Sequence, residues 1–213
     1  MRSVTDNDVL LKGACYGFLR ALVAKVPGEG PSGVLGSSQF IVPKKISKMR
    51  LNGSPARALN ELASFLKESH IIEPSTDEQV MAARFEATAQ RLALNLDAGE
   101  SQLLAVVVSR NVSWLITGDK RAIISIEPVV KNESHLRFVA GKIRCLEQLV
   151  RDLLLADAVE FIRASICAEP TVDKALSICL GCTGEGAILE EILTGLASYI
   201  EDLRQKAPVV LSI

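Results

Sequence analysis

The apolar positions of this chain recur mostly with helical spacing. Over residues 9–26, for example, Val9, Leu10, Ala14, Phe18 and Leu22 fall on one helical face. A glycine- and proline-rich run at 27–33 ends this helix. The same pattern, with its caps and breaks, predicts further helices over 54–69, 76–96, 97–110, 120–126, 142–168, 171–181 and 186–206.

Helix starts are marked by capping residues. Ser54 followed by Pro55 suits the first turn of a helix. The run from Thr76 to Gln79 reads as a capping box that opens the next helix.

Short β-branched or apolar runs separate the helices of the first two thirds of the chain. The strongest is 112–117, and further strands are expected just before Asp6 and at 40–42, 70–73 and 136–140. Strands that alternate with helices predict an α/β fold with three layers, α/β/α, around a central parallel sheet. We therefore expect an α/β domain over residues 1–140 and an all-helical extension over 141–213 packed on it.

Composition limits the class of protein. Hydrophobic residues make up 48% of the chain, which excludes disorder throughout. Aromatic residues make up only 4%, so the core must be aliphatic. The chain has no apolar run long enough to cross a membrane and no apolar stretch like that of a signal peptide near Met1. We expect a cytoplasmic protein without membrane contact.

The five cysteines are unevenly spaced and do not suggest a disulfide framework, so we expect reduced thiols. Cys167, Cys179 and Cys182 would supply only three of the four ligands that structural zinc needs.

Charge is distributed unevenly, although the net charge is only −1. Much of the positive charge of the first 60 residues lies in Lys44, Lys45, Lys48 and Arg50. Such a stretch is typical of a solvated surface, and the alternative is a contact to a nucleic-acid backbone.

Motif analysis leaves carboxylates as the candidate chemistry, because the phosphate-binding, dinucleotide-binding and serine-hydrolase glycine motifs are missing. Asp6 and Asp119 follow predicted strands, Glu100 begins a helix, and Glu61 lies on a helix. Ligands of open parallel sheets bind at the carboxyl ends of the strands. Oxygen ligands suit Mg²⁺ or Mn²⁺, and two such ions can clamp a phosphodiester.

Four segments resemble PIN-domain ribonucleases over roughly residues 1–140. Residues 5–11 (TDNDVLL) resemble the family's first strand, aspartate and apolar helix, and residues 60–62 (NEL) match its second acidic position. Residues 96–105 (LDAGESQLLA) resemble its Gly-Glu helix start. Residues 115–122 (LITGDKRA) resemble its Thr-x-Asp strand end and basic helix.

The resemblance implies that Asp6, Glu61, Glu100 and Asp119 are catalytic metal ligands for Mg²⁺ or Mn²⁺, and that the protein is an endoribonuclease that hydrolyses RNA through an activated water. Thr117 would support the cluster by hydrogen bonding. Asp8 stands where the family often has Asn, so it is either a fifth acid or the true ligand of its pair. Lys120 and Arg121 would contact phosphate, or balance the acids.

Each acid also has a structural interpretation. Asp97 and Glu100 form a second potential capping box, Asp6 and Asp119 are good N-caps, and a helical Glu61 is typically solvent-exposed.

The alternatives for function are a non-catalytic PIN-like binding or scaffold protein, the toxin of a toxin–antitoxin pair, and a phosphatase. In the first of these, residues 142–213 would bind a partner protein. In the nuclease, the same residues could block, shape or regulate the site, or form a homodimer.

Overall fold

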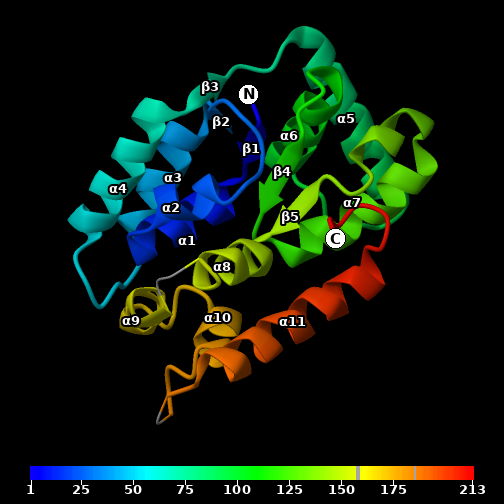
Figure 1. Cartoon of the computed structure of the whole chain (residues 1–213). Helices are drawn as coiled ribbons and strands as arrows, with labels where there is room; N and C mark the ends of the chain where they lie inside the picture. Colours follow the sequence, from blue (N-terminus) through cyan, green and yellow to red (C-terminus); the bar gives the residue numbers. More distant parts are fainter. Residues whose placement is uncertain (157–158, 185) are drawn as a thin grey trace.

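Five parallel strands form the centre of the molecule. The computed structural model describes residues 1–156, 159–184 and 186–213 (Figure 1). The strand order is β3-β2-β1-β4-β5, with β1 at Ser3–Thr5, β2 at Ser32–Leu35, β3 at His70–Ile72, β4 at Trp114–Thr117 and β5 at Ile143–Cys145. The expected α/β class with a parallel sheet is confirmed.

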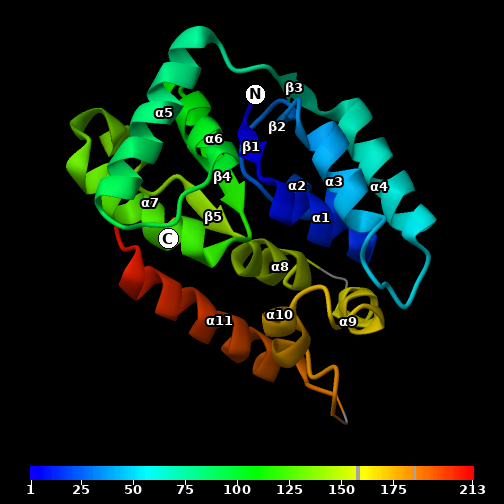
Figure 2. The same ribbon diagram turned by 180° about the vertical axis from the view of Figure 1, so that it is seen from behind.

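Helices flank the sheet, because parallel neighbours must be joined by crossover connections. One hydrophobic cluster is built with α1 (Asn7–Tyr16), α2 (Leu19–Ala24), α3 (Ser38–Ile46), α4 (Pro55–Glu68) and α8 (Leu146–Leu154). The other is built with α5 (Thr76–Arg91), α6 (Ala98–Ser109), α7 (Lys120–Asn132) and the 3₁₀ helix η1 (Ser134–Val139). Figures 1 and 2 show α1–α4 and α5–α7 on opposite sides of the sheet.

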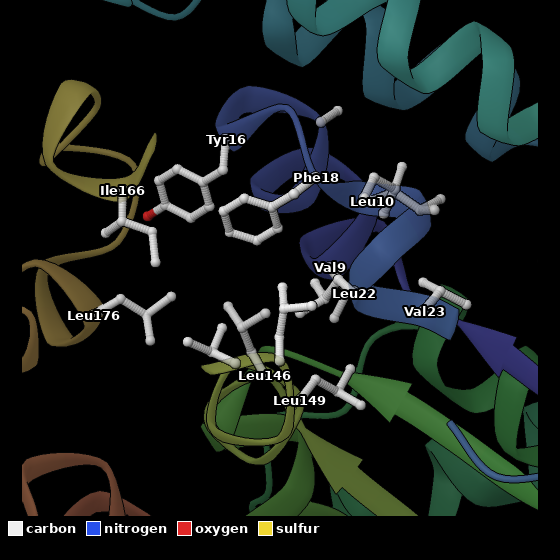
Figure 3. Close-up of a cluster of buried hydrophobic side chains, with 14 of the residues drawn as sticks. Val9, Leu10, Tyr16, Phe18, Leu22, Val23, Leu146, Leu149, Ile166 and Leu176 are labelled. Atoms are coloured by element: carbon white, nitrogen blue, oxygen red, sulfur yellow. The ribbon is translucent and has the colours of Figure 1, made fainter. Parts of the chain in front are cut away.

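The C-terminal helices α9 (Val159–Ala168), α10 (Lys174–Cys179) and α11 (Leu189–Lys206) gather at one end of the molecule (Figures 1 and 2). They share a core with the α/β part of the chain. Ile166 of α9 and Leu176 of α10 are fully buried in the same cluster as Tyr16 and Leu146, and Figure 3 shows these side chains together. The extension is therefore packed on the sheet-bearing part by apolar burial.

The chain end returns to the sheet. Leu211 forms an isolated parallel bridge with Ile143, and the backbone N–H groups of Val209 and Val210 donate to Glu127 Oε2, each at 3.0 Å. This bridging segment lies beside β5, the edge strand of the sheet.

Two strand predictions were wrong. Residues 40–42 lie inside α3, where Ser38, Val42 and Ile46 are buried at four-residue spacing while Phe40 and Ile41 are exposed. Residues 136–140 lie largely in η1, where Leu136 and Val139 are buried three residues apart. In both places an apolar run follows helical periodicity, which a short window does not distinguish from a strand.

Other predictions need smaller corrections. The helix over 9–26 is divided, because Gly17 adopts a left-handed conformation (φ 76°) that ends α1. The capping box of α5 uses Ser75 with Glu78 rather than Thr76 with Gln79, and α5 ends at Arg91 rather than near residue 96. The strands β2 and β5 were not predicted, and β5 falls in the part expected to be all-helical.

The prediction of reduced thiols was wrong for two of the cysteines. Cys167 and Cys182 form a disulfide that joins α9 to the segment after α10, while Cys15, Cys145 and Cys179 are free. Because Cys167 and Cys182 are bonded to each other, their sulfur atoms are not available as zinc ligands. Within the described ranges, no helix is both long and apolar enough to cross a bilayer.

Loss of this disulfide should destabilise the protein. The bond spans a sequence separation of 15 residues, and a cross-link of that size contributes about 3 kcal/mol through the unfolded chain. We expect Cys167→Ser/Cys182→Ser to lower the urea-derived free energy of unfolding by about that amount, with Cys15→Ser as the free-cysteine control. Thiol titration of the denatured, non-reduced protein should find the three free cysteines, and five titratable thiols would contradict the bond.

Candidate acidic site

The site lies where the direction of the crossover connections reverses. β1 pairs with β2 on one side and β4 on the other, so the chain leaving β1 turns toward β2 while β4 is reached from the far side. In a doubly wound sheet, this reversal leaves a crevice at the carboxyl ends of the two central strands. Asp6 follows β1 directly and Gly118-Asp119 follow β4, so the fold brings both predicted acids to this crevice.

The Thr117 side chain joins the ends of these two strands. Its hydroxyl donates to Asp6 Oδ2 at 3.0 Å and accepts the backbone N–H of Asp119 at 3.1 Å. Asp6 Oδ1 also accepts the N–H of Asn7 at 2.6 Å, which makes Asp6 the N-cap of α1. The role expected of Thr117, hydrogen bonding to an acid of the cluster, is present in the structure.

Asp119 caps α7. Its Oδ1 accepts the N–H groups of Arg121 at 2.8 Å and Ala122 at 3.4 Å, and Arg121 Nη2 lies 3.1 Å from Oδ2. Asp119 therefore has both expected placements: it caps α7, and it follows the end of β4.

Glu100 is a capping residue that also faces Asp119. Its backbone N–H donates to Asp97 Oδ1 at 2.8 Å, and its Oε2 accepts the N–H of Asp97 at 2.9 Å, as a capping box requires. Glu100, Asp119 and Arg121 line one hollow of about 370 Å³ between the start of α6 and the start of α7. The third predicted acid thus reaches the same place from a different helix.

Asp8 lies at the same edge, in the first turn of α1. Its Oδ2 is 2.6 Å from Lys12 Nζ, an i,i+4 ion pair. The carboxylate also lies against Gly118, and a Cβ at that position would collide with Oδ2. Glycine between Thr117 and Asp119 is what lets Asp8 approach the end of β4.

The C-terminal extension reaches this edge with charged side chains that sequence reasoning missed. Lys12 Nζ is also 2.7 Å from Asp173 Oδ2, at the start of α10. Lys120 Nζ is 2.6 Å from Glu147 Oε1 of α8 and 4.6 Å from the centre of the Tyr199 ring of α11. The i,i+4 spacing of Asp8 and Lys12 was readable in the sequence, but nothing in the sequence links either lysine to the extension.

Glu61 is not brought to this group. It lies on α4, where its Oε1 accepts the N–H of Arg20 at 3.4 Å, and it lines a separate hollow with Gly17 and Arg57. Gly17 is at the far end of the ten-residue α1, which places this hollow about 15 Å along the helix from Asp6. The predicted quartet is therefore a different set in the structure: Asp6, Asp8, Glu100 and Asp119.

The basic stretch is exposed. Lys44 and Lys45 lie in the last turn of α3, and Lys48 and Arg50 lie in the connection that follows. Among the described residues, no hydrogen bond or ion pair joins these four side chains to the acidic group.

Burial and mutual repulsion disturb the ionisation of the acids. Burial raises the pKa of Asp6 from 3.8 to about 6 against the hydrogen bond from Thr117, and Asp8 raises it further. Burial also raises the pKa of Glu100 from 4.5 to about 7, with contributions from Asp97, Asp6 and Asp119. Within the described residues, neither Asp6 nor Glu100 is in an ion pair.

The other two acids have cationic partners. Burial raises the pKa of Asp8 despite Lys12. Burial acts to raise the pKa of Asp119 too, but the hydrogen bonds from Arg121 hold it below its ordinary value. Asp8 acts on Asp6, and Asp119 acts on both Asp8 and Glu100, so repulsion runs through the group without joining every pair.

The donor chemistry of this group fits a hard divalent cation, since every donor is a carboxylate oxygen. The acids are not already gathered as a coordination sphere. Within the part of the chain that the structure describes, no three His, Cys, Asp or Glu side chains converge closely enough to hold an ion. Ion binding would require carboxylates to turn from their present hydrogen bonds toward the hollow.

The fold and these residues define an α/β protein with an acidic crevice at the reversal point of a parallel sheet. The chain has no significant match to a protein-family profile, a curated protein sequence or a solved structure.

The raised pKa of Asp6 predicts that this carboxylate costs stability at neutral pH. The folded protein holds the Asp6 proton to about pH 6 and the unfolded chain only to about pH 4, so the folded state loses relative stability as pH rises through that window. We expect Asp6→Asn, which keeps an oxygen acceptor for Asn7, to raise the free energy of unfolding at pH 8 by about 1–2 kcal/mol.

Urea unfolding at several pH values checks this expectation. The difference between Asp6→Asn and wild type should shrink toward zero below pH 4. Asp202→Asn, at an exposed ion pair of α11, is the control and should differ little from wild type at either extreme. A loss of stability on Asp6→Asn that is the same at pH 4 and pH 8 would contradict the assigned shift.

Proposed function

We propose that this chain is a Mg²⁺- or Mn²⁺-dependent endoribonuclease of PIN-like type. The observation that carries the proposal is the placement of Asp6, Asp8, Glu100 and Asp119, after β1, at the start of α1, at the start of α6 and after β4, at one edge of the sheet, where they influence one another's ionisation. Crowded, partly desolvated carboxylates lower the stability of the folded protein. Perturbed groups of this kind concentrate at functional sites. Their order along the chain is also that of the resemblance to PIN-domain ribonucleases.

In this proposal, Asp6, Glu100 and Asp119 hold the cation, with Asp8 beside them. When bound, Mg²⁺ or Mn²⁺ supplies positive charge for the phosphodiester oxygens and makes water a stronger nucleophile. Thr117 fixes the orientation of Asp6 through its hydroxyl. Asp6 and Glu100, whose pKa values are raised, would release their protons when the cation binds, because a positive charge favours the carboxylate form.

The basic residues of the proposal fall into two groups. Arg121 lines the same hollow as Glu100 and Asp119 and is largely exposed, so its guanidinium is available to a phosphate. Lys120 is turned toward Glu147 and Tyr199 instead, which favours a charge-balancing role. Lys44, Lys45, Lys48 and Arg50 remain proposed contacts to the more distant RNA backbone, where exposed cations interact without fixed geometry.

A cleavage assay with two charge-removing variants tests the proposal. Asp119→Asn and Glu100→Gln remove the charge but keep the helix caps, because Asn is a good N-cap and Gln suits the third position of a capping box. We expect wild type to cleave a fluorescent single-stranded RNA with Mn²⁺ or Mg²⁺ and not with EDTA. Each variant should lose about 100-fold or more in rate, since loss of a metal ligand removes several kcal/mol of transition-state stabilisation.

Controls separate this result from general damage. Glu68→Gln removes one carboxylate from an exposed ion pair with Arg20 and should leave cleavage within about twofold of wild type. A DNA oligonucleotide of the same sequence and a small phosphate ester, assayed in parallel, distinguish a ribonuclease from a deoxyribonuclease or a phosphatase. Metal-dependent RNA cleavage that survives Asp119→Asn would remove Asp119 from the ligand set.

One observation favours a second candidate, a non-catalytic binding protein with the same fold. The extension places Asp173, Glu147 and Tyr199 at the acidic edge, and such contacts would also suit a closed site. A wild-type protein that binds no Mn²⁺ in calorimetry and cleaves none of the three substrates would favour this candidate. The toxin role, a homodimer, a partner protein bound through residues 142–213 and a cytoplasmic location stay predictions.

A further inference from the structure

Lys12 links the start of α10 in the C-terminal extension to the acidic site. Lys12 Nζ lies between two carboxylates, 2.6 Å from Asp8 Oδ2 and 2.7 Å from Asp173 Oδ2. The side chains of Lys12 and Asp173 are only 14% and 9% exposed, so solvent screens this contact far less than it screens a surface ion pair.

The two oxygens of Asp173 have different tasks. Oδ1 accepts the backbone N–H of Leu176 at 3.0 Å and caps α10, while Oδ2 faces Lys12. The cap needs only an oxygen acceptor, whereas the contact to Lys12 uses the negative charge. A substitution can therefore remove one function and keep the other.

The position of Asp173 is fixed from both sides. Leu176, three residues later, is fully buried in the cluster shown in Figure 3. Asp173 also lies within the segment closed by the Cys167–Cys182 disulfide. The carboxylate is thus held at this place by the packing of the extension rather than by a flexible surface loop.

On the other side of Lys12, Asp8 has little freedom. Its carboxylate lies against Gly118, and Lys12 holds the same oxygen that approaches this glycine. Without the Asp173 carboxylate, the positive charge of Lys12 would be balanced by the carboxylates of the site alone. There it would compete with a divalent cation.

We infer that Asp173 is a positioning residue of the acidic site: it holds the Lys12 ammonium between the extension and Asp8, and so keeps the site's carboxylates available to a divalent cation. The inference rests on the proposed function. It assigns to the extension a role in cation binding, the positioning of Lys12, in addition to the acids of the α/β domain.

The test is a double-mutant cycle on Mn²⁺ affinity, measured by titration calorimetry or by electron paramagnetic resonance of free Mn²⁺. Asp173→Asn keeps the α10 cap and removes the charge. We expect it to weaken Mn²⁺ binding by about five- to tenfold, because the positive charge of Lys12 is then no longer shared with Asp173 and acts on Asp8 and its neighbours alone. Asp202→Asn removes the same charge from an exposed ion pair on α11 and should change the affinity by less than about twofold.

Lys12→Met supplies the second edge of the cycle. If Asp173 acts through Lys12, the effect of Asp173→Asn should fall to about twofold or less in the Lys12→Met background. Urea unfolding and circular dichroism of each variant confirm that affinities are compared between folded proteins.

The outcomes are distinct. An unchanged Mn²⁺ affinity of folded Asp173→Asn, with wild type binding normally, overturns the inference and leaves the proposed function in place. An equal effect of Asp173→Asn in both backgrounds also overturns it, because Asp173 would then act without Lys12. Wild-type protein that binds no Mn²⁺ overturns the proposed function, and the inference with it.

Discussion

The parallel pairing of β1 with β4 is the constraint on which the acidic site depends. Thr5 pairs with Ile116, so the next residue in each segment, Asp6 after β1 and Thr117 at the end of β4, lie side by side and share a hydrogen bond. Because the chain leaves this pair in opposite directions, no crossover helix covers the carboxyl ends of both strands. A shift of one residue in this register would move Asp6 away from Thr117 and turn neighbouring side chains to the other face of the sheet.

Helix capping and the gathering of acids use the same backbone geometry here. Asp6, Asp119 and the pair of Asp97 with Glu100 all lie at helix starts, where unpaired N–H groups and the helix dipole favour negative charge. These helix starts offset part of the cost of bringing carboxylates together. The cost that is left is seen in the raised pKa values of Asp6 and Glu100. Capping alone would not require the caps of three helices to converge on one crevice.

The C-terminal extension contributes charge as well as apolar burial. It shares the core cluster of α1 and α2 through Leu146, Ile166 and Leu176. It also provides acidic partners for the two lysines that border the site, Asp173 for Lys12 and Glu147 for Lys120. Burial of a lysine near carboxylates is favourable only with such partners. The extension and the acidic edge are therefore parts of one electrostatic unit.

The sequence by itself determined the α/β class, the strands β1, β3 and β4, the helices α4 and α6, and the candidate acids Asp6, Asp8, Glu100 and Asp119, because caps and periodicity are local properties. It did not determine β2 and β5, which are short and have weak patterns, or the helical state of residues 40–42. Only the tertiary structure decided that Glu61 faces a separate hollow, that Cys167 meets Cys182, and that Asp173 meets Lys12. These are contacts between segments far apart in the chain, and they depend on how helices pack, which no local pattern specifies.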